Sequence, residues 1–379
     1  MMKKISAVIL ALLFFMLCGV TPAYAALDSA EEADKYLDTS GFEELLDNAP
    51  SASREQLVDQ GMEKISDASG LTVSGLWETI THEVTNSLRQ PLKILCSLIG
   101  IILVCVLLQS VGSSLSQSNV HQVFQIIVSV FIVTILLNPI IECTMEIGTS
   151  IDEFSIFLTT YVPAFAGVIP SAGQPMTAAA YNILLFGICQ VIGQLLKNFF
   201  VPLVSCYLAL AVVSEICPQM GLHQMIAGIK SFITWALGLS MTIFFGLLTI
   251  QSVVASSGDN IAVKTTKFFI SSFIPAVGGT LSDLFVATQG CMQLLKSTVG
   301  VFGIVIALFT FLPVLIKTAM WYITVQIGGL IGGIFGITEI NRLLKSIASA
   351  LGIVLAIILY YSLLFIISTT LMIVAFKGG

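Results

Sequence analysis

Charged residues are scarce in this chain of 379 residues, where Asp, Glu, Lys and Arg together make up only 10% of the sequence. In a typical soluble domain about a quarter of the residues are charged, so the composition excludes an ordinary soluble protein. Hydrophobic residues instead make up 56%, and the mean hydropathy is +0.98. The composition therefore predicts an all-α polytopic membrane protein.

Motifs for catalysis and metal binding are also missing. No G-x-x-x-x-G-K-[ST], H-E-x-x-H, G-x-S-x-G or C-x-x-C pattern occurs, which excludes P-loop nucleotide hydrolysis and the commonest zinc and serine-hydrolase sites. His82, His121 and His223 are far apart in the sequence and lack the additional ligands that a metal site needs. We predict no enzyme activity, no cofactor, no metal and no nucleic-acid partner.

The first 90 residues divide into two parts. Lys3 and Lys4, the apolar run 5–20 and the small residues near position 25 match a signal peptide at residues 1–25, with an uncleaved anchor helix as the alternative. Residues 26–90 carry a net charge of about −10, because they hold fourteen of the 22 acidic residues. We predict that residues 26–90 form an acidic, helical, extracytoplasmic segment.

Two helices are predicted within this acidic segment. Ser53 and Gln56 have the spacing of a capping box, and a longer apolar stripe includes Trp77 and ends just before Pro91. Trp77 favours a helix that lies along the outer membrane surface. A helix that binds a partner protein is the alternative.

Apolar windows of about 20 residues, the length that spans a bilayer, predict about eight transmembrane helices. These windows cover residues 92–111, 120–141, 178–196, 199–216, 231–254, 297–316, 318–337 and 350–375. With the acidic segment outside, eight crossings also place the C-terminus and an acidic loop at 142–153 outside. The side predicted to be cytoplasmic holds the larger share of basic residues, namely Lys197, Lys264, Lys267, Lys296, Arg342 and Lys345.

An internal repeat follows a predicted transmembrane hairpin at residues 91–142. The sequence FLTTYVPAFAG at 157–167 returns as FFISSFIPAVG at 269–279, and Gly221 matches Gly336 at an offset of 115. The two copies cover residues 143–256 and 257–379, and each contains three predicted crossings. An odd number of crossings inverts the second copy in the bilayer, as in many transporters and channels.

Proline and glycine interrupt two apolar stretches, at 154–175 and 266–283. Such residues remove a backbone donor or permit positive φ, and unpaired backbone at membrane depth is tolerated only inside protein or along a wet cavity. We predict two re-entrant or broken helices that line a conduit. The alternatives are an interfacial helix followed by a loop, or residues that only permit tight turns and packing. The candidate conduit residues are Pro163, Gly167, Pro170, Pro275, Gly278 and Gly279.

A glycine run near the C-terminus has the small-xxx-small spacing that lets helix backbones approach closely, so we predict a role in helix packing. The run comprises Gly328, Gly329, Gly332, Gly333 and Gly336. The acidic residues after Glu153 are Glu215, Asp259, Asp283 and Glu339, and all fall at the ends of predicted segments. The absence of a carboxylate near mid-membrane weighs against an ion-coupled carrier.

The combined pattern resembles the stage III sporulation protein AE family of endospore-forming bacteria. The signal peptide, the acidic segment and the stretch FLTTYVPAFAGVIPSAGQPMTAAAYN at 157–182 carry this resemblance, which covers essentially the whole chain. It implies a multi-pass protein in the mother-cell membrane around the engulfed forespore. There it would act with other stage III sporulation A proteins, a forespore membrane partner and a separate ATPase-like subunit. The resemblance implies no catalytic residues.

We therefore expect a permease-like component of a channel or secretion complex between mother cell and forespore. A non-conducting structural scaffold for that complex is the alternative, and an autonomous secondary transporter is a third possibility. A water-filled path between the two copies of the repeat would favour the conduit. A dry and fully packed interface between them would favour the scaffold.

Overall fold

A computed structural model describes residues 45, 48–59, 73–112, 118–171, 176, 179, 187–216, 218–273 and 278–374. Every regular element in this part of the chain is a helix, which confirms the predicted all-α class. The predicted signal peptide and residues 26–44, 46–47 and 60–72 of the acidic segment lie outside the described residues.

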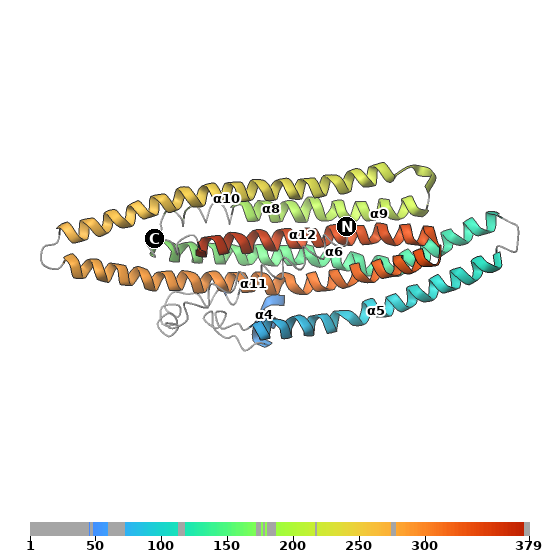
Figure 1. Cartoon of the computed structure of the whole chain (residues 1–379), viewed down its shortest axis with the longest axis horizontal. Helices are drawn as coiled ribbons and strands as arrows, with labels where there is room; N and C mark the ends of the chain where they lie inside the picture. The colour runs from blue at the N-terminus through green and yellow to red at the C-terminus, as the bar shows by residue number, and fades with distance from the viewer. Residues whose placement is uncertain are drawn as a thin grey trace.

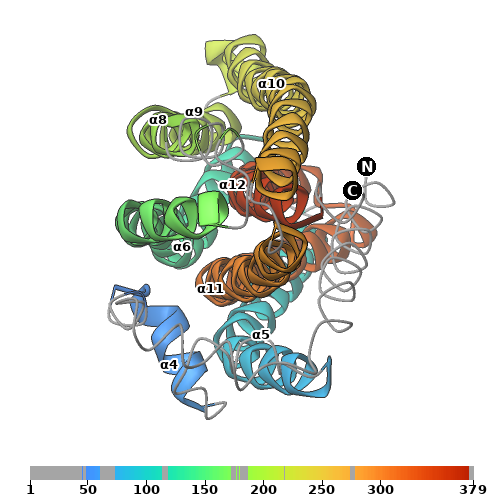
Figure 2. The ribbon, with the colours of Figure 1, turned by 90° about the vertical axis from the view of Figure 1, so that its left-hand side faces the viewer.

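The helices form an elongated bundle in which long members lie side by side (Figure 1). The end-on view places α11 and α12 in the interior, with α5, α6, α9 and α10 around them (Figure 2). The elements are α4 (Ser51–Asp59), α5 (Val73–Gly112), α6 (Ser118–Ser171), α8 (Cys189–Leu195), the π-helical turn η4 (Leu196–Phe200), α9 (Val201–Ile216), the 3-10 turn η5 (Pro218–Met220), α10 (His223–Phe273), α11 (Gly278–Ile334) and α12 (Thr338–Val374).

Six helices in the described residues are long and apolar enough to cross a bilayer, which confirms a polytopic membrane protein. The apolar spans are Trp77–Leu108, Ile126–Gly167, Cys189–Ile216, His223–Gln251, Lys296–Ile334 and Thr338–Thr370. The predicted windows 178–196 and 199–216 meet in one continuous helix from Cys189 to Ile216. The windows 297–316 and 318–337 likewise belong to α11.

Prolines lie within or close to the start of several long helices. Pro313 lies inside α11, and Pro202 is the second residue of α9, just after the π-helical turn η4. Pro91 lies inside α5, so the predicted boundary between the acidic segment and the first crossing falls within a helix. Membrane helices tolerate proline because neighbouring helices and local π or 3-10 adjustments satisfy the backbone groups that it frees.

The two copies of the repeat run in the same direction. Gly221 (φ 64°) lies in the turn between α9 and α10, and Gly336 (φ 77°) lies in the turn between α11 and α12. Glu215, just before the first turn, forms an ion pair of 3.5 Å with Arg342, just after the second. Both turns therefore lie at the same end of the bundle (Figure 1). The matched helices are α9 and α10 in the first copy and α11 and α12 in the second. Both pairs turn at the same end of the bundle, so the second pair has the orientation of the first and the predicted inversion is wrong.

Six crossings also change the expected side of two connections. If the acidic segment is extracytoplasmic, the turn at Gly221 becomes cytoplasmic and Lys264 becomes extracytoplasmic, whereas eight crossings predict the reverse. We expect topology reporters fused after Gly221 and Lys264 to be read out as cytoplasmic and exported, respectively. Fusions after Ser118 and Ser171 serve as controls. Six crossings and eight crossings both place Ser118 in the cytoplasm and Ser171 outside it. An exported reporter at Gly221 would contradict the six-helix arrangement.

Candidate functional site

The first predicted conduit stretch is not interrupted. Helix α6 continues through Pro163 and Gly167 and ends at Ser171, one residue after Pro170. Pro163 and Gly167 are exposed, and a Cβ on Gly167 would have no atom within 4 Å. The predicted break is wrong here because a proline in a membrane helix disturbs only the local hydrogen bonds.

The second predicted stretch is a connection between two helices. Helix α10 ends at Phe273 and α11 begins at Gly278, so Gly278 and Gly279 form the first turn of α11. Pro275 lies outside the described residues. In Figure 1 the C-terminal end of α10 and the start of α11 lie at the opposite end of the bundle from the turns at Gly221 and Gly336.

The opposite face of α6 carries a cluster of aromatic side chains, which we call the aromatic core. Phe154, Phe157, Tyr161 and Phe165 recur every three or four residues, so they share one helix face, and each is fully buried. The ring of Phe154 lies 5.1 Å from that of Phe311 and 4.9 Å from that of Phe365, centroid to centroid. The full aromatic core is Phe154, Phe157, Tyr161 and Phe165 of α6, Phe302 and Phe311 of α11, and Tyr361 and Phe365 of α12.

Glycines of two neighbouring helices let the backbone approach these rings. A Cβ on Gly303 of α11 would overlap the ring of Tyr161. A Cβ on Gly193 of α8 would lie 2.8 Å from the hydroxyl of Tyr361. The aromatic core thus fills the space between helices of the first copy, α6 and α8, and helices of the second, α11 and α12. The spacing of the α6 aromatics was visible in the sequence, but the glycines that face them were not.

Acidic residues of α6 form ion pairs with lysines from two other helices. Lys317 of α11 pairs with Glu146, and Lys197 of η4 pairs with Asp152. The prediction of an acidic loop at 142–153 is wrong, since these residues lie inside α6. The prediction also placed Lys197 and Lys317 on opposite sides of the membrane, whereas both contact α6 within two turns of each other.

Helix α4 of the acidic segment is docked on the bundle. The hydroxyl of Ser51 donates to Oε2 of Glu153 over 2.9 Å, and the backbone N–H of Ser51 donates to the same carboxylate over 3.2 Å. A carboxylate at a helix N-terminus is also favoured by the helix dipole. The predicted capping box is wrong, because α4 begins at Ser51 and Ser53 donates its hydroxyl to the carbonyl of Pro50. Leu57 of α4 is buried.

The glycine run of α11 lies against α12. A Cβ on Gly329 would lie 3.4 Å from Cβ of Leu344, and one on Gly333 would lie 3.0 Å from Nδ2 of Asn341. Gly336 follows in the turn with positive φ, which glycine adopts without steric cost. Gly328 and Gly332 of the run also have α12 side chains within 4 Å of the Cβ position.

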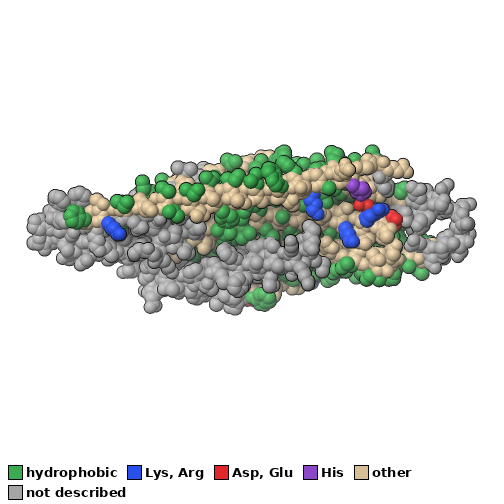
Figure 3. Space-filling model, turned by 45° about the horizontal axis from the view of Figure 1, so that its top comes forward, with side chains coloured by type: hydrophobic (Ala, Val, Ile, Leu, Met, Phe, Trp, Pro, Cys, Tyr) green, Lys and Arg blue, Asp and Glu red, His purple; other side chains and the backbone are tan. Residues whose placement is uncertain are grey.

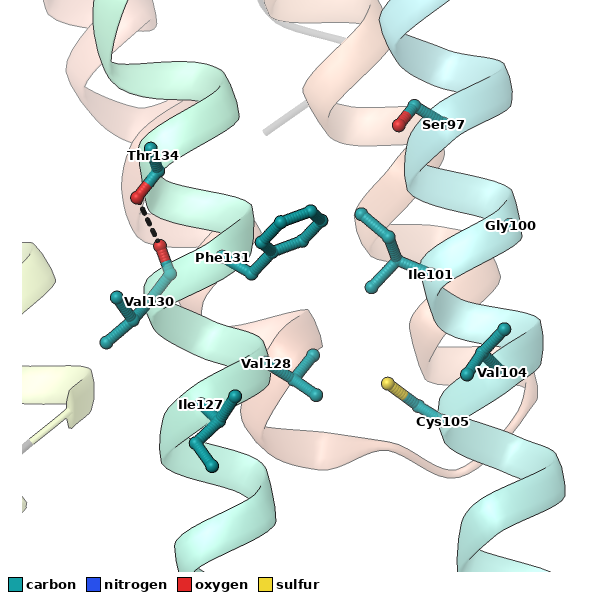
Figure 4. A pocket seen from close by; sticks show the side chains of 10 residues that line it. All are labelled: Ser97, Gly100, Ile101, Val104, Cys105, Ile127, Val128, Val130, Phe131 and Thr134. Atoms are coloured by element: carbon teal, nitrogen blue, oxygen red, sulfur yellow. Dashed lines mark hydrogen bonds between the residues drawn. The ribbon is translucent and has the colours of Figure 1, made fainter.

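A groove of about 690 Å³ lies between α5 and α6 (Figure 4). Its hydroxyl groups come from Ser97 and Thr134, and the Thr134 hydroxyl donates to the carbonyl of Val130. The apolar lining offers almost nothing that could replace the hydration of an ion or a hydrophilic solute. The lining residues are Ser97, Gly100, Ile101, Val104, Cys105, Ile127, Val128, Val130, Phe131 and Thr134.

Helices α10 and α11 each bury one charged residue. Asp259 is 2% exposed and Lys296 is 3% exposed, and the two interact electrostatically. Asp259 also accepts a hydrogen bond of 2.9 Å from the backbone N–H of Met176. The prediction that Asp259 lies at a solvated segment end is wrong, because α10 continues to Phe273 and Asp259 is buried within it. Among the described residues, no group of three or more His, Cys, Asp or Glu side chains is arranged to hold a metal ion.

These features define an all-α, multi-pass membrane protein whose helices are joined by a packed aromatic core and by ion pairs. Its sequence matches the family model of stage III sporulation protein AE over residues 55–376, and the chain belongs to that family. The stage III sporulation protein AE of Bacillus subtilis (strain 168) is 27% identical over 287 residues, which cover 75% of this chain and 71% of that protein. No solved structure matches the chain. Family membership supports a role in sporulation.

Proposed function

We propose that this chain is a non-conducting structural subunit of a membrane complex needed for endospore development. It would lie in the mother-cell membrane around the forespore, with its acidic segment extracytoplasmic and without enzyme activity of its own. Its partners would be other stage III sporulation A proteins, a forespore membrane protein and an ATPase-like subunit. The scaffold is thus preferred to the permease-like conduit.

The aromatic core is the observation that carries this proposal. A solute path needs polar walls or water, because an ion or hydrophilic molecule must replace its hydration shell as it passes. The interface between the two copies, where such a path was expected, contains fully buried rings with centroids about 5–6 Å apart. Side chains in such contact leave no space for water. A conduit would therefore have to run between this chain and another protein.

Contacts between distant parts of the chain also suit a scaffold. Ser51 of the acidic segment is bonded to Glu153 in the bundle, and Lys317 and Lys197 attach α11 and η4 to α6. These bonds fix the extracytoplasmic segment relative to the membrane helices. A partner bound to either part would then be held in a defined position.

An autonomous carrier is supported by one observation, the buried carboxylate of Asp259. Buried carboxylates often bind coupling ions in transporters. In this chain, however, the carboxylate is engaged by the N–H of Met176 and lies within the electrostatic influence of Lys296. This arrangement favours a structural role over ion coupling.

Reconstitution of the purified full chain into liposomes tests the proposal. We expect no release of trapped ions or of a small fluorescent dye above that of empty liposomes, because the aromatic core blocks the only interface expected to conduct. Co-reconstitution with an established channel protein controls for vesicle quality. Release that rises with the number of copies per vesicle would contradict the scaffold and support the conduit. Ion-driven uptake against a gradient would support the carrier.

A further inference from the structure

Helix α10 has a long apolar face that is exposed to the surroundings. Figure 3 shows hydrophobic side chains along this helix, which runs across the upper part of the molecule. The large exposed side chains recur at intervals of three, four or seven residues, so they form one continuous stripe. We call this the α10 face, and its members are Met225, Phe232, Trp235, Leu239, Ile243, Leu247, Ile250, Val254, Ile261 and Phe268.

The α10 face is too long to be covered by lipid alone. From Met225 to Phe268 a helix rises by roughly 65 Å at 1.5 Å per residue, whereas the hydrocarbon core of a bilayer is about 30 Å thick. Even a tilt of about 40°, the upper end of the usual range, brings only about 39 Å of helix into hydrocarbon. The apolar part of α10 suited to a bilayer ends at Gln251, yet Val254, Ile261 and Phe268 beyond it are also exposed. The hydrocarbon core of a bilayer therefore does not cover the whole stripe.

The middle of the α10 face has the shape of a helix-packing surface. Gly238, Thr242 and Gly246 are exposed and separated by four residues each, in the pattern G-x-x-x-T-x-x-x-G. A Cβ on Gly238 or Gly246 would have no atom within 4 Å. The Thr242 hydroxyl is satisfied by the carbonyl of Gly238 over 2.9 Å. Small residues at this spacing inside a membrane span allow another helix to approach closely, which lipid chains do not require.

We propose that the α10 face binds the same face of a second copy of this chain, forming a parallel homodimer. A two-fold axis along the membrane normal brings identical residues together, so a symmetric contact tolerates no charge along its centre. The α10 face meets this condition. Lys230 is turned inward to donate to the hydroxyl of Ser349, and Asp259 is buried. Lys264 is the one exposed charged side chain described on α10, and it lies near the far end of the stripe.

An unlike partner would have left a different pattern on this helix. Interfaces between different proteins commonly use complementary charges to select the partner, and the stripe between Phe232 and Val254 offers none. The pairing of two copies does not depend on the proposed scaffold function. A conducting protein could be assembled by the same contact.

Oligomer measurements on the full chain in lipid nanodiscs or liposomes test the homodimer. We expect the fluorescently labelled wild type to show two-step photobleaching at raised protein-to-lipid ratios. The double variant Gly238→Ile and Gly246→Ile should raise the dimer dissociation constant by about tenfold or more, because branched side chains hold the helices apart. The variant should fold normally, since both added side chains point into open space and isoleucine is a better helix former than glycine.

Gly148→Ile on α6 is the matched control, because its Cβ position is also free of neighbours within 4 Å. We expect it to dimerise like the wild type. A photo-crosslinking residue at Ile243 should give a product of twice the monomer mass, whereas one at Val191 on α8, which is as exposed, should not. A wild type that stays monomeric at every lipid ratio would overturn the proposal. So would a double variant that dimerises normally, or a crosslink from Ile243 only to a different protein.

Discussion

Replacing Gly303 with leucine should abolish accumulation of the folded protein in the membrane. A Cβ at this position would overlap the ring of Tyr161, and the leucine adds three further carbons. Tyr161 cannot move aside easily, because its ring stacks on Phe157 and Phe165 and its hydroxyl donates to the carbonyl of Val299. Overpacking in a close-packed core costs about 1–3 kcal/mol and sometimes more, and an overlap with a fully buried ring belongs to the severe cases. Immunoblots of membrane fractions and thermal unfolding in detergent measure the effect.

Gly167→Leu is the control for this experiment. The sequence predicts that Gly167 is a conduit residue, yet it lies on the exposed face of α6 with open space around it. We expect this variant to accumulate and unfold like the wild type. Removing the ring that the new side chain overlaps should restore part of the stability. Gly303→Ala combined with Tyr161→Leu should therefore be more stable than Gly303→Ala alone. Normal accumulation of Gly303→Leu would show that α6 and α11 are not packed as described.

The class of protein was predictable from sequence because hydropathy is a local property. The membrane character, the helical class and the family all follow from residues read in short windows. The match of Gly221 with Gly336 also identified two equivalent positions, which share a left-handed backbone conformation in equivalent turns. Only glycine adopts this conformation freely, so the repeat preserved the residue type that the turn requires.

The number and direction of the crossings could not be read in this way. Lys197 and Lys317 looked like the ends of apolar windows, since a lone lysine is costly within a bilayer. Each instead pairs with a carboxylate of α6 that is far away in the sequence. Because the two windows on either side of each lysine belong to one helix, the described residues hold six candidate spans where eight were predicted, and the matched helices run in the same direction. The error came from a tertiary contact that no window contains.

The predicted break at Pro163 and Gly167 is wrong for a related reason. The sequence predicts a break there because both residues weaken an isolated helix. In the bundle, the buried face of the same turns is fixed by Tyr161 and Phe165, and this packing maintains the helix. The residues that matter most at this site, such as Gly303, carry no signal in a single sequence, because a glycine against a ring looks like any other glycine.

Replacing Asp259 with asparagine should destabilise the protein more than removing the carboxylate from any of the described ion pairs. Asparagine keeps an oxygen that can accept the N–H of Met176, so only the negative charge is lost. Lys296, which is 3% exposed, would then remain buried without the carboxylate that stabilises it electrostatically. Loss of this buried electrostatic interaction should cost no more than the roughly 3–5 kcal/mol that is typical of a broken buried ion pair. Thermal unfolding in detergent and the amount of protein in membranes should both fall clearly.

Two further variants separate loss of the charge interaction from loss of packing. Asp152→Asn removes a carboxylate whose pair with Lys197 is more than a third exposed on both sides, so it should cost at most about 1 kcal/mol. Lys296→Met in the Asp259→Asn background removes the lysine charge while keeping a long apolar side chain, and it should restore part of the lost stability. Equal effects of Asp259→Asn and Asp152→Asn would contradict a buried electrostatic contact between α10 and α11. If Lys296→Met restores no stability, the loss in Asp259→Asn does not come from the charge of Lys296. Asp259 would then act mainly through its hydrogen bond to Met176, which the asparagine would have failed to reproduce.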